Sequence, residues 1–513
     1  MLSIVKSMTL HGLEGFIVDV QVDVAGGLPC WEIVGLPDVS IREAKERVRT
    51  AIKNSGYEFP SRRIVINLAP ATIKKVGSAF DLPIAIAILL ATENINEFDF
   101  ENVAFVGELS LDGNVHSITG ILPMCIEAKK LGIKEIVVPK ENAKEASIVD
   151  GINVIPVSSL NQVVAYLNKS IKINPEKFNS NELIKSNQVY NLDFSEVKGQ
   201  KNIKRAIEVA ASGGHNCMLI GSPGSGKTMM ARRIPTILPK LSFEEALEVT
   251  KIHSVAGNIS ENSPLIINRP FRFPHHTISK TSLVGGGAIP KPGEISLAHY
   301  GVLFLDELPE FKRSVLEVLR QPLEQRSIQI TRTSGNYIFP ADFMLVSAMN
   351  TCPCGKFPST ACTCTPAQIQ TYLSKISQPF LDRIDLSVEA SKVEYRDLVK
   401  ESVSCPESSS VIKARVCEAR KRQKIRYQNT KIQCNAMLHG AELSKYCRLN
   451  GEEMRLMGQA YDVLNLTARS YHRILKVART IADLDYSEEI KLEHLQEAIG
   501  YRTLDRKYWG RYA

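Results

Sequence analysis

Short apolar runs alternate with segments of helical spacing through the N-terminal third of the chain. Runs rich in β-branched residues and bounded by turn residues predict strands at 64–69, 103–109, 134–139 and 153–157. Apolar residues at helical spacing predict helices at 42–55 and 82–92. Asp112-Gly113 separates two strand-like runs and predicts a hairpin turn. This order of elements predicts an α+β or α/β domain.

A polar, asparagine-rich segment, 169–192, interrupts the pattern and predicts a linker. A second α/β unit begins near Asp193, and its strand-like runs are apolar throughout, at 217–221, 301–307 and 343–350. Apolar strands separated by helical stretches are typical of a parallel sheet that is covered on both faces. Residues 401–410 form a second break, and only helical signals follow it.

Composition narrows the class of protein. The chain has 513 residues, of which 44% are hydrophobic and 23% are charged, as in globular proteins. Its longest apolar run, 82–91, is about half the length that spans a bilayer, and the N-terminus lacks the apolar core of a signal peptide. Seven of the eleven cysteines are scattered, which does not suggest a secreted disulfide framework. We therefore expect a cytoplasmic protein without membrane-spanning segments.

The strongest motif is G-x-x-x-x-G-K-[ST], which follows an apolar strand and precedes a helical stretch. Glycines let the backbone wrap a phosphate and point N–H groups at it, and the next helix adds the positive end of its dipole. Lys227 would neutralise the β- and γ-phosphates of a nucleotide, and Thr228 would offer its hydroxyl to Mg²⁺. The residues of this phosphate loop are Gly221, Ser222, Pro223, Gly224, Ser225, Gly226, Lys227 and Thr228.

A metal-binding acid and a group that activates water are expected beside such a loop. The apolar run at 302–307 ends in Asp306 and Glu307. In this arrangement the aspartate lies beside Mg²⁺ and the glutamate polarises the attacking water. The next apolar run ends in Asn350, which is placed to contact the γ-phosphate or that water.

Phosphoryl transfer also gains from a cation that stabilises the developing charge, often supplied by a neighbouring subunit. Arg383 in FLDRIDL and Arg473 in YHRILKVARTIADL are the basic candidates. A surface salt bridge is the more common role of an arginine, so composition alone does not assign either residue to catalysis.

Four cysteines lie close together in the chain, and they are Cys352, Cys354, Cys362 and Cys364. Four thiolates at this spacing can surround a tetrahedral Zn²⁺. Their C-x-C pairs are tighter than the C-x₂-C of most zinc sites, so four reduced cysteines on a loop are the alternative. Zinc here would stiffen the segment that follows Asn350. The adjacent pair His275-His276 is interpreted as loop packing or hydrogen bonding.

A net charge of +8 permits nucleic-acid binding without demonstrating it. Residues 411–428 contain seven Lys or Arg and one Glu at helical spacing. A basic helix of this kind would neutralise phosphates whatever the base sequence, and a solvated helix face is the alternative. The chain has no zinc-finger, homeodomain or RNP signature, which favours binding through the DNA backbone.

Together these motifs resemble the AAA+ ATPases, and within them the YifB/ComM family of the magnesium-chelatase-like branch. The resemblance covers nearly the whole chain in order, through segments such as HNCMLIGSPGSGKT, FRFPHHTISKTSLVGGG, GVLFLDELPEF, AMNTCPCG, CTCTPAQIQTY and FLDRIDL. It implies that Gly221–Thr228 is Walker A and that Asp306-Glu307 is Walker B. It also implies that Asn350 is sensor 1, that Arg383 is an arginine finger for the adjacent subunit, and that Arg473 is sensor 2.

The resemblance further implies a domain order within the α/β fold class. The implied parts are a Lon-protease-like α+β domain at 1–168, a linker at 169–192, an AAA+ P-loop NTPase core at 193–400 and a helical lid at 411–513. Residues 282–293 resemble a helix-2 insertion, and 327–340 resemble a hairpin before sensor 1. In this branch both insertions tend to point into a ring pore.

The N-terminal domain resembles the Lon protease domain, but the catalytic pair is missing. Ala79 stands where Lon has its nucleophilic serine, Ser78 is one position off, and Leu122 replaces the lysine. Without a lysine to accept its proton, a serine hydroxyl is a poor nucleophile. We therefore expect no peptidase activity and a scaffolding or DNA-handling role.

The function that the resemblance implies is an ATP-hydrolysing motor that acts on DNA, built as a hexameric ring and using ATP and Mg²⁺. It would act on single-stranded or branched DNA, as a branch-migration helicase or translocase in recombination during natural transformation. Three alternatives remain: a motor subunit for inserting metal into a tetrapyrrole, an ATP-dependent protease, and a motor that remodels proteins. The first would need a partner, because the chain lacks a D-x-S-x-S motif.

Overall fold

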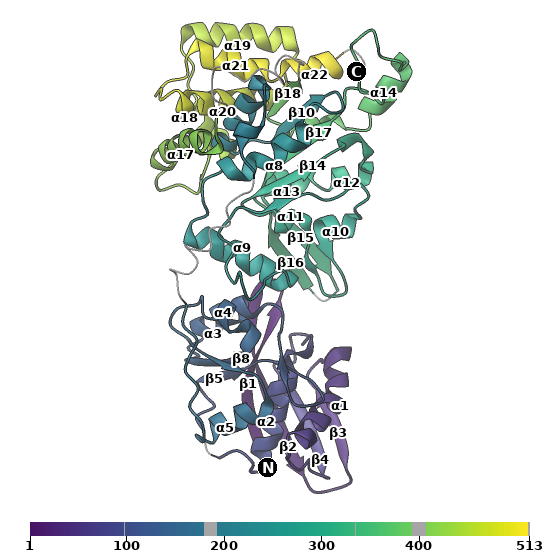
Figure 1. The fold of residues 1–513 in the computed structure, drawn as a ribbon, viewed down its shortest axis with the longest axis vertical. Helices are drawn as coiled ribbons and strands as arrows, with labels where there is room; N and C mark the ends of the chain where they lie inside the picture. Colours follow the sequence, from purple (N-terminus) through teal and green to yellow (C-terminus); the bar gives the residue numbers. More distant parts are fainter. Residues whose placement is uncertain (97, 179–191, 334, 392–406, 511–513) are drawn as a thin grey trace.

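The computed structural model describes residues 1–96, 98–178, 192–333, 335–391 and 407–510. Figure 1 shows an elongated molecule, with a sheet domain at the N-terminal end, a second α/β unit in the middle and a group of helices at the far end. Most of the predicted linker and of the second predicted break lies outside the described residues. Among the described helices, none is long and apolar enough to cross a membrane.

A seven-stranded mixed sheet organises the N-terminal domain, in the order β3-β4-β2-β1-β5-β8-β9. Its strands are β1 (Leu2–His11), β2 (Glu14–Ala25), β3 (Cys30–Val34), β4 (Arg63–Ala69), β5 (Val103–Phe105), β8 (Glu135–Pro139) and β9 (Asn153–Val157). Its helices are α1 (Val39–Asn54), α2 (Asp81–Ala91), α3 (Ile121–Lys130), α4 (Ala143–Ala146) and α5 (Leu160–Leu167). The predicted strands and helices of this region are all present. The run at 103–109 is divided, because β6 (Glu108–Leu109) leaves the sheet to pair with β7 (Val115–His116) across the predicted turn.

The helix α2 forms the centre of this domain. It is apolar around its whole circumference and almost every residue in it is buried, as expected for a helix covered on all sides. It packs against β1 and β2 on one side and α1 on the other. The sequence pattern did not predict the long β1–β2 hairpin, whose strands alternate buried and exposed residues around a turn at Gly12.

The central unit is built on a five-stranded sheet in the order β11-β14-β17-β10-β18, and every neighbouring pair is parallel, as the apolar runs predict. Its strands are β10 (Cys217–Gly221), β11 (Phe271–Arg272), β14 (Val302–Leu305), β17 (Met344–Met349) and β18 (Leu386–Ala390). The helices are α7 (Lys201–Gly213), α8 (Lys227–Ile237), α9 (Phe243–Ala256), α10 (Lys280–Val284), α11 (Glu294–Leu297), α12 (Arg313–Glu317), α13 (Arg320–Gln325), α14 (Pro366–Leu373) and α15 (Gln378–Leu381).

Both predicted insertions contain short antiparallel pairs. The segment at 282–293 holds β12 (Gly285–Gly286) and β13 (Lys291–Pro292), and the segment at 327–340 is the hairpin of β15 (Ser327–Arg332) and β16 (Gly335–Pro340). The C-terminal region is helical, as predicted. Its helices are α17 (Ser409–Arg426), α18 (Gly440–Tyr446), α19 (Gly451–Leu464), α20 (Ala468–Leu484), α21 (Leu492–Gly500) and α22 (Thr503–Tyr508). Apolar residues of α17 and α20 share one buried cluster with α7 and β10.

The N-terminal domain meets the central unit at the tip of the β1–β2 hairpin. The His11 ring stacks on Tyr337 of β16, with ring centroids 4.4 Å apart. A Cβ atom placed on Gly335, the first residue of β16, would lie 3.1 Å from the His11 ring, so the start of this strand also lies close to the tip. Nearby, the Gly120 N–H at the start of α3 donates to the Ser254 carbonyl of α9. The hairpin that was expected to point into a pore therefore contacts the N-terminal domain.

We expect this aromatic contact to couple the stability of the two parts. His11→Ala and Tyr337→Ala should each lower the unfolding temperature, and the double variant should lose about 0.5–1.5 kcal/mol less than the sum of the single losses, since stacked rings contribute that much beyond burial. Differential scanning calorimetry measures this, with exposed His116→Ala as the control. Strictly additive losses would show that the stacking carries no coupling.

Candidate active site

The phosphate loop joins the end of β10 to the start of α8. Gly224 and Gly226 have φ angles of 75° and 85°, in the left-handed region that glycine adopts without strain. Gly226 is also the residue that caps the N-terminus of α8. The loop therefore has the backbone shape and the helix N-terminus that bind an anionic phosphate group.

Lys227 lies inside this loop and is buried. Its Nζ donates to the carbonyl oxygens of Gly221 and Ser222, each at 2.9 Å, and lies 3.3 Å from Oδ1 of Asn350. Burial lowers the pKa of Lys227, and the nearby Asp306 carboxylate acts in the opposite direction. Since its hydrogen-bond partners are neutral, an ionised phosphate would be a stronger acceptor for this cation.

Thr228 and Asp306 come together across the sheet edge. The Thr228 hydroxyl donates to Oδ2 of Asp306 at 2.5 Å, and the Glu307 N–H donates to Oδ1 of the same carboxylate at 2.9 Å. Hydroxyl and carboxylate oxygens are the ligand types that Mg²⁺ takes in nucleotide sites. The two side chains therefore fit a magnesium ion bound together with a triphosphate.

Glu307 has an unusual backbone conformation. Its φ angle is 53°, which is rare for a residue with a side chain and is often found where function demands it. Its side chain is 59% exposed, and Oε2 lies 3.3 Å from Nδ1 of His276. His276 is therefore in polar contact with the candidate water-activating carboxylate, in line with the hydrogen-bonding alternative for this histidine pair.

The sequence pattern did not predict that His276 lies beside Glu307. It follows β11, which is only two residues long and was not predicted as a strand. Because β11 pairs in parallel with β14, the chain after it emerges at the same edge of the sheet as Asp306 and Glu307. Only the sheet order brings the histidine to the site.

Arg383 and Arg473 lie near the amino ends of the central strands, whereas the phosphate loop lies at their carboxyl ends. Asn216, directly before β10, donates its Nδ2–H to the Arg383 carbonyl at 3.0 Å and its N–H to Asp385 at 2.9 Å. The phosphate loop starts at the other end of β10. Because a strand rises about 3.3 Å per residue, the two ends of β10 are roughly 13 Å apart. The structure therefore brings the loop, Asp306, Glu307 and Asn350 together, and places the two arginines elsewhere.

The Arg383 side chain is held by contacts within the chain. It is 5% exposed, donates to the carbonyl oxygens of Arg320 and Pro379, and forms an ion pair of 2.6 Å with Glu324. Arg469 of α20 pairs with the same Glu324 oxygen at 3.0 Å. Arg383 and Glu324 line a pocket of about 530 Å³ together with residues of α10, α12 and α13.

Arg473 of α20 faces the start of β18, where its Nη1 lies 3.4 Å from Oδ1 of Asp385. Although burial acts to raise the pKa of Asp385, the Arg473 cation and the neighbouring His215 outweigh it and lower that pKa. Asp385 is therefore ionised and ties the helix α20 to the central sheet. Arg473 is thus placed where the C-terminal helices meet the sheet.

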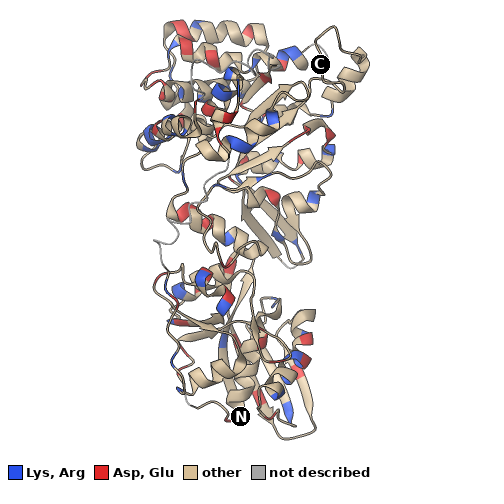
Figure 2. Cartoon of the chain, viewed as in Figure 1, with Lys and Arg blue, Asp and Glu red and all other residues tan. Residues whose placement is uncertain are grey.

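The basic helix at 411–428 corresponds to α17, where Figure 2 shows a concentration of Lys and Arg. Several of these side chains form ion pairs or hydrogen bonds with other residues of the protein. Arg415 pairs with Glu208, Arg420 donates to the Ala211 carbonyl, and Arg426 pairs with Asp483. Lys421 and Lys424 are exposed. Much of the positive charge therefore attaches the helix to α7 and α20, and the two lysines remain at the surface.

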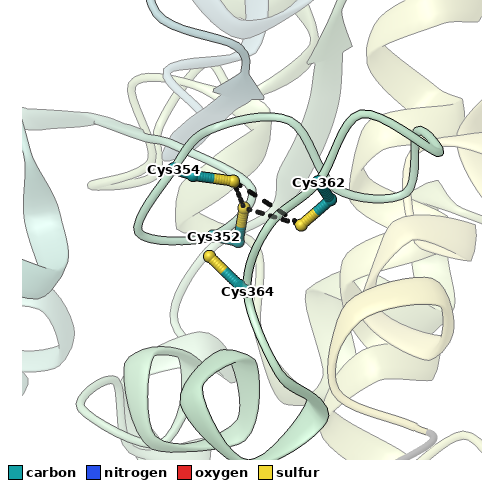
Figure 3. A group of neighbouring side chains, drawn as sticks. All are labelled: Cys352, Cys354, Cys362 and Cys364. Atoms are coloured by element: carbon teal, nitrogen blue, oxygen red, sulfur yellow. Dashed lines mark hydrogen bonds between the residues drawn. The ribbon is translucent and has the colours of Figure 1, made fainter.

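The four clustered cysteines do come together, as Figure 3 shows. Their sulfur atoms all lie within 4.8 Å of one another, which is consistent with a structural zinc site.

The residues of the N-terminal domain that were compared with Lon form no catalytic pair. Leu122 is buried in the core, and Ala79 is nearly buried. The Ser78 hydroxyl donates to the Glu108 carboxylate, and the buried Lys75 donates to the Pro70 carbonyl. Ser78 is thus bonded to a carboxylate and Lys75 to the backbone, and the absence of peptidase activity stays a prediction.

Comparisons with known proteins agree with this geometry. Residues 193–398 match the family model described as magnesium chelatase, subunit ChlI, residues 20–142 match that of subunit ChlI of Mg-chelatase, and residues 406–502 match the ChlI C-terminal model. The chain is 44% identical over 505 residues to YifB of Escherichia coli, with 98% of each chain covered.

The chain is also 41% identical over 510 residues to competence protein ComM of Haemophilus influenzae, again with 98% of each chain covered. Lon protease 2 of Bacillus subtilis is 28% identical over 191 residues, which cover 34% of this chain and 33% of that protein. The last similarity is partial, and the first two extend over nearly the full length. The chain belongs to the YifB/ComM family of magnesium-chelatase-like ATPases.

Proposed function

We propose that this protein is an ATP-driven motor that moves along or remodels DNA, in the manner of a branch-migration helicase or translocase during natural transformation. The observation that carries the ATPase part is the meeting of Lys227, Thr228, Asp306 and Glu307 at one edge of the parallel sheet. The DNA part is supported by the 41% identity to a protein named for competence.

The chemistry follows from the site. Backbone N–H groups of the loop and the Lys227 cation bind the phosphates of ATP, and Mg²⁺ held by Thr228 and Asp306 would neutralise part of their charge. Glu307, oriented by His276, accepts a proton from the attacking water. Asn350, close to Lys227, positions the γ-phosphate or the water.

We also propose that the protein works as a ring, with six subunits as the expected number. Arg383 lies at the strand ends away from its own phosphate loop, where it would face the ATP of a neighbouring subunit. Arg473, on α20, would act as sensor 2 of the helical lid. The proposed domains are 1–168, 193–400 and 411–513, with 169–192 as the linker. The first would act as a scaffold that supports the hairpin of β15 and β16.

A strand-displacement assay tests the motor. A labelled four-way or three-strand DNA junction should be resolved in the presence of ATP and Mg²⁺ by the wild-type protein, and not by Lys227→Ala. A second candidate function is a motor subunit that acts on a separate protein partner, which the magnesium chelatase family models favour. Robust ATP hydrolysis with no displacement of any branched DNA would support that candidate instead.

A further inference from the structure

The loop between β17 and α14 brings four sulfur atoms to one point (Figure 3). Sulfur–sulfur distances are 3.4 Å from Cys352 to Cys354, 3.7 Å from Cys352 to Cys362 and 3.5 Å from Cys354 to Cys362. Four Zn–S bonds of about 2.3 Å in a tetrahedron place the sulfurs about 3.8 Å apart. A disulfide would need about 2.05 Å. The spacing is that of a metal site.

The backbone of the loop is folded around these sulfurs. The Gly355 N–H donates to the Cys352 carbonyl at 2.9 Å, and the Phe357 N–H points at the Cys352 sulfur at 3.4 Å. The Cys362 N–H donates to the Ser359 carbonyl at 3.0 Å, which closes a second turn. An N–H group directed at a thiolate sulfur stabilises its charge and orients the ligand.

The first turn of this loop lies directly against the phosphate loop. Gly355 has a φ angle of 73°, and a Cβ atom placed on it would lie 2.2 Å from Cδ of Pro223. Only a residue without a side chain allows this approach. The loop also begins directly after Asn350, whose side chain lies 3.3 Å from Lys227 Nζ. The cysteine loop therefore contacts the ATP site at two points.

The other side of the loop packs against the last helix of the described chain. The Phe357 ring meets the Tyr508 ring edge to face, with centroids 6.2 Å apart. The Trp509 indole N–H donates to the Leu373 carbonyl in α14, and the four cysteines belong to the same apolar cluster as Trp509. The loop thus lies between the phosphate loop and the C-terminal helices.

We propose that the four cysteines bind one Zn²⁺ as thiolates, releasing their protons to solvent, and that the loaded loop holds the phosphate loop in its ATP-binding shape through Gly355 and Pro223. The second part rests on the ATP site of the proposed function. Without the metal, four thiolates or thiols this close would separate, because nothing would offset their mutual repulsion and crowding. Pro223 of the phosphate loop would then lose its contact with Gly355.

The test measures metal and nucleotide binding on the full-length protein. Elemental analysis of protein purified without chelators should give about one zinc per chain. The double variant Cys362→Ser/Cys364→Ser should lose it, and Cys30→Ser, which changes an exposed cysteine in the N-terminal domain, should keep it. Absence of zinc in the wild type, or iron in its place, would overturn the metal assignment.

The Kd of a fluorescent ATP analogue measures the coupling between the zinc-loaded cysteine loop and the ATP site. Removing zinc with a chelator should raise this Kd about tenfold or more, and adding Zn²⁺ back should restore it, which excludes simple misfolding. Gly355→Ala keeps all four ligands, so it should retain zinc and still weaken nucleotide binding. An unchanged Kd after zinc removal would overturn the coupling. Failure of zinc-loaded wild type to bind nucleotide would contradict the proposed function while leaving the metal site in place.

Discussion

Glu307→Gln is expected to bind ATP about as tightly as the wild type and to hydrolyse it about 10²–10⁴-fold more slowly, the usual contribution of a positioned general base. The amide has nearly the same shape as the carboxylate but cannot accept the proton of the attacking water. The Glu307 side chain is half-exposed and lies beside His276, so its replacement leaves no unpaired charge in the core.

Rates of phosphate release and the Kd of a fluorescent ATP analogue measure the two effects separately. Glu310→Gln is a matched control, because Glu310 is an exposed glutamate in the same segment and pairs with Lys375. Near wild-type hydrolysis by Glu307→Gln would show that another group activates the water, and equal losses in both variants would point to damage of the segment.

Arg383→Ala is expected to bind ATP normally and to lose about 10³-fold or more in turnover, the effect of removing an arginine finger. The residue lies at the sheet edge remote from its own phosphate loop, so the loss should appear in the neighbour's site. To reach it, the guanidinium would exchange Glu324 for a phosphate, a stronger acceptor.

Mixing subunits tests this directly. Lys227→Ala keeps Arg383 but cannot hold the phosphates, and Arg383→Ala keeps the phosphate loop. Each should be inactive alone, and a mixture should regain hydrolysis at the seams that join an intact loop to an intact arginine. Failure of the mixture, although mixed oligomers form, would contradict action between subunits.

Stability must be separated from catalysis in this experiment, because Arg383 also makes internal hydrogen bonds. Arg383→Lys keeps the positive charge beside Glu324 but not the two-pronged geometry of the guanidinium, so it should fold normally and still be slow. Exposed Arg455→Ala serves as the neutral control. A fully active lysine variant would mean that Arg383 has only a structural role.

The sequence predicted the parts of the fold that depend on local pattern. Apolar runs correctly gave the strands β10, β14 and β17, and the glycine spacing gave the loop that follows β10. The elements that the sequence did not predict are strands that form only by pairing with another strand. The hairpin of β1 and β2 has no strong turn signal, and β11 is too short to show a pattern and exists because it pairs with β14.

The same distinction holds for the site. Asp306, Glu307 and Asn350 could be placed beside the loop because the ends of parallel strands share one sheet edge. His276 could not, since it reaches Glu307 only through the order of the strands. The spacing of residues along the chain predicts neither the ion pair of Arg383 with Glu324 nor the contact of Gly355 with Pro223.

The most direct test of the central claim, that ATP hydrolysis at this loop is coupled to DNA, is the steady-state rate of phosphate release with Mg²⁺ and with single-stranded, duplex or branched DNA. We expect a measurable basal rate, an increase of several-fold with single-stranded or branched DNA, and no activity in Lys227→Ala under any condition. A wild-type protein that releases no phosphate, or whose rate is the same with and without every form of DNA, would contradict the account.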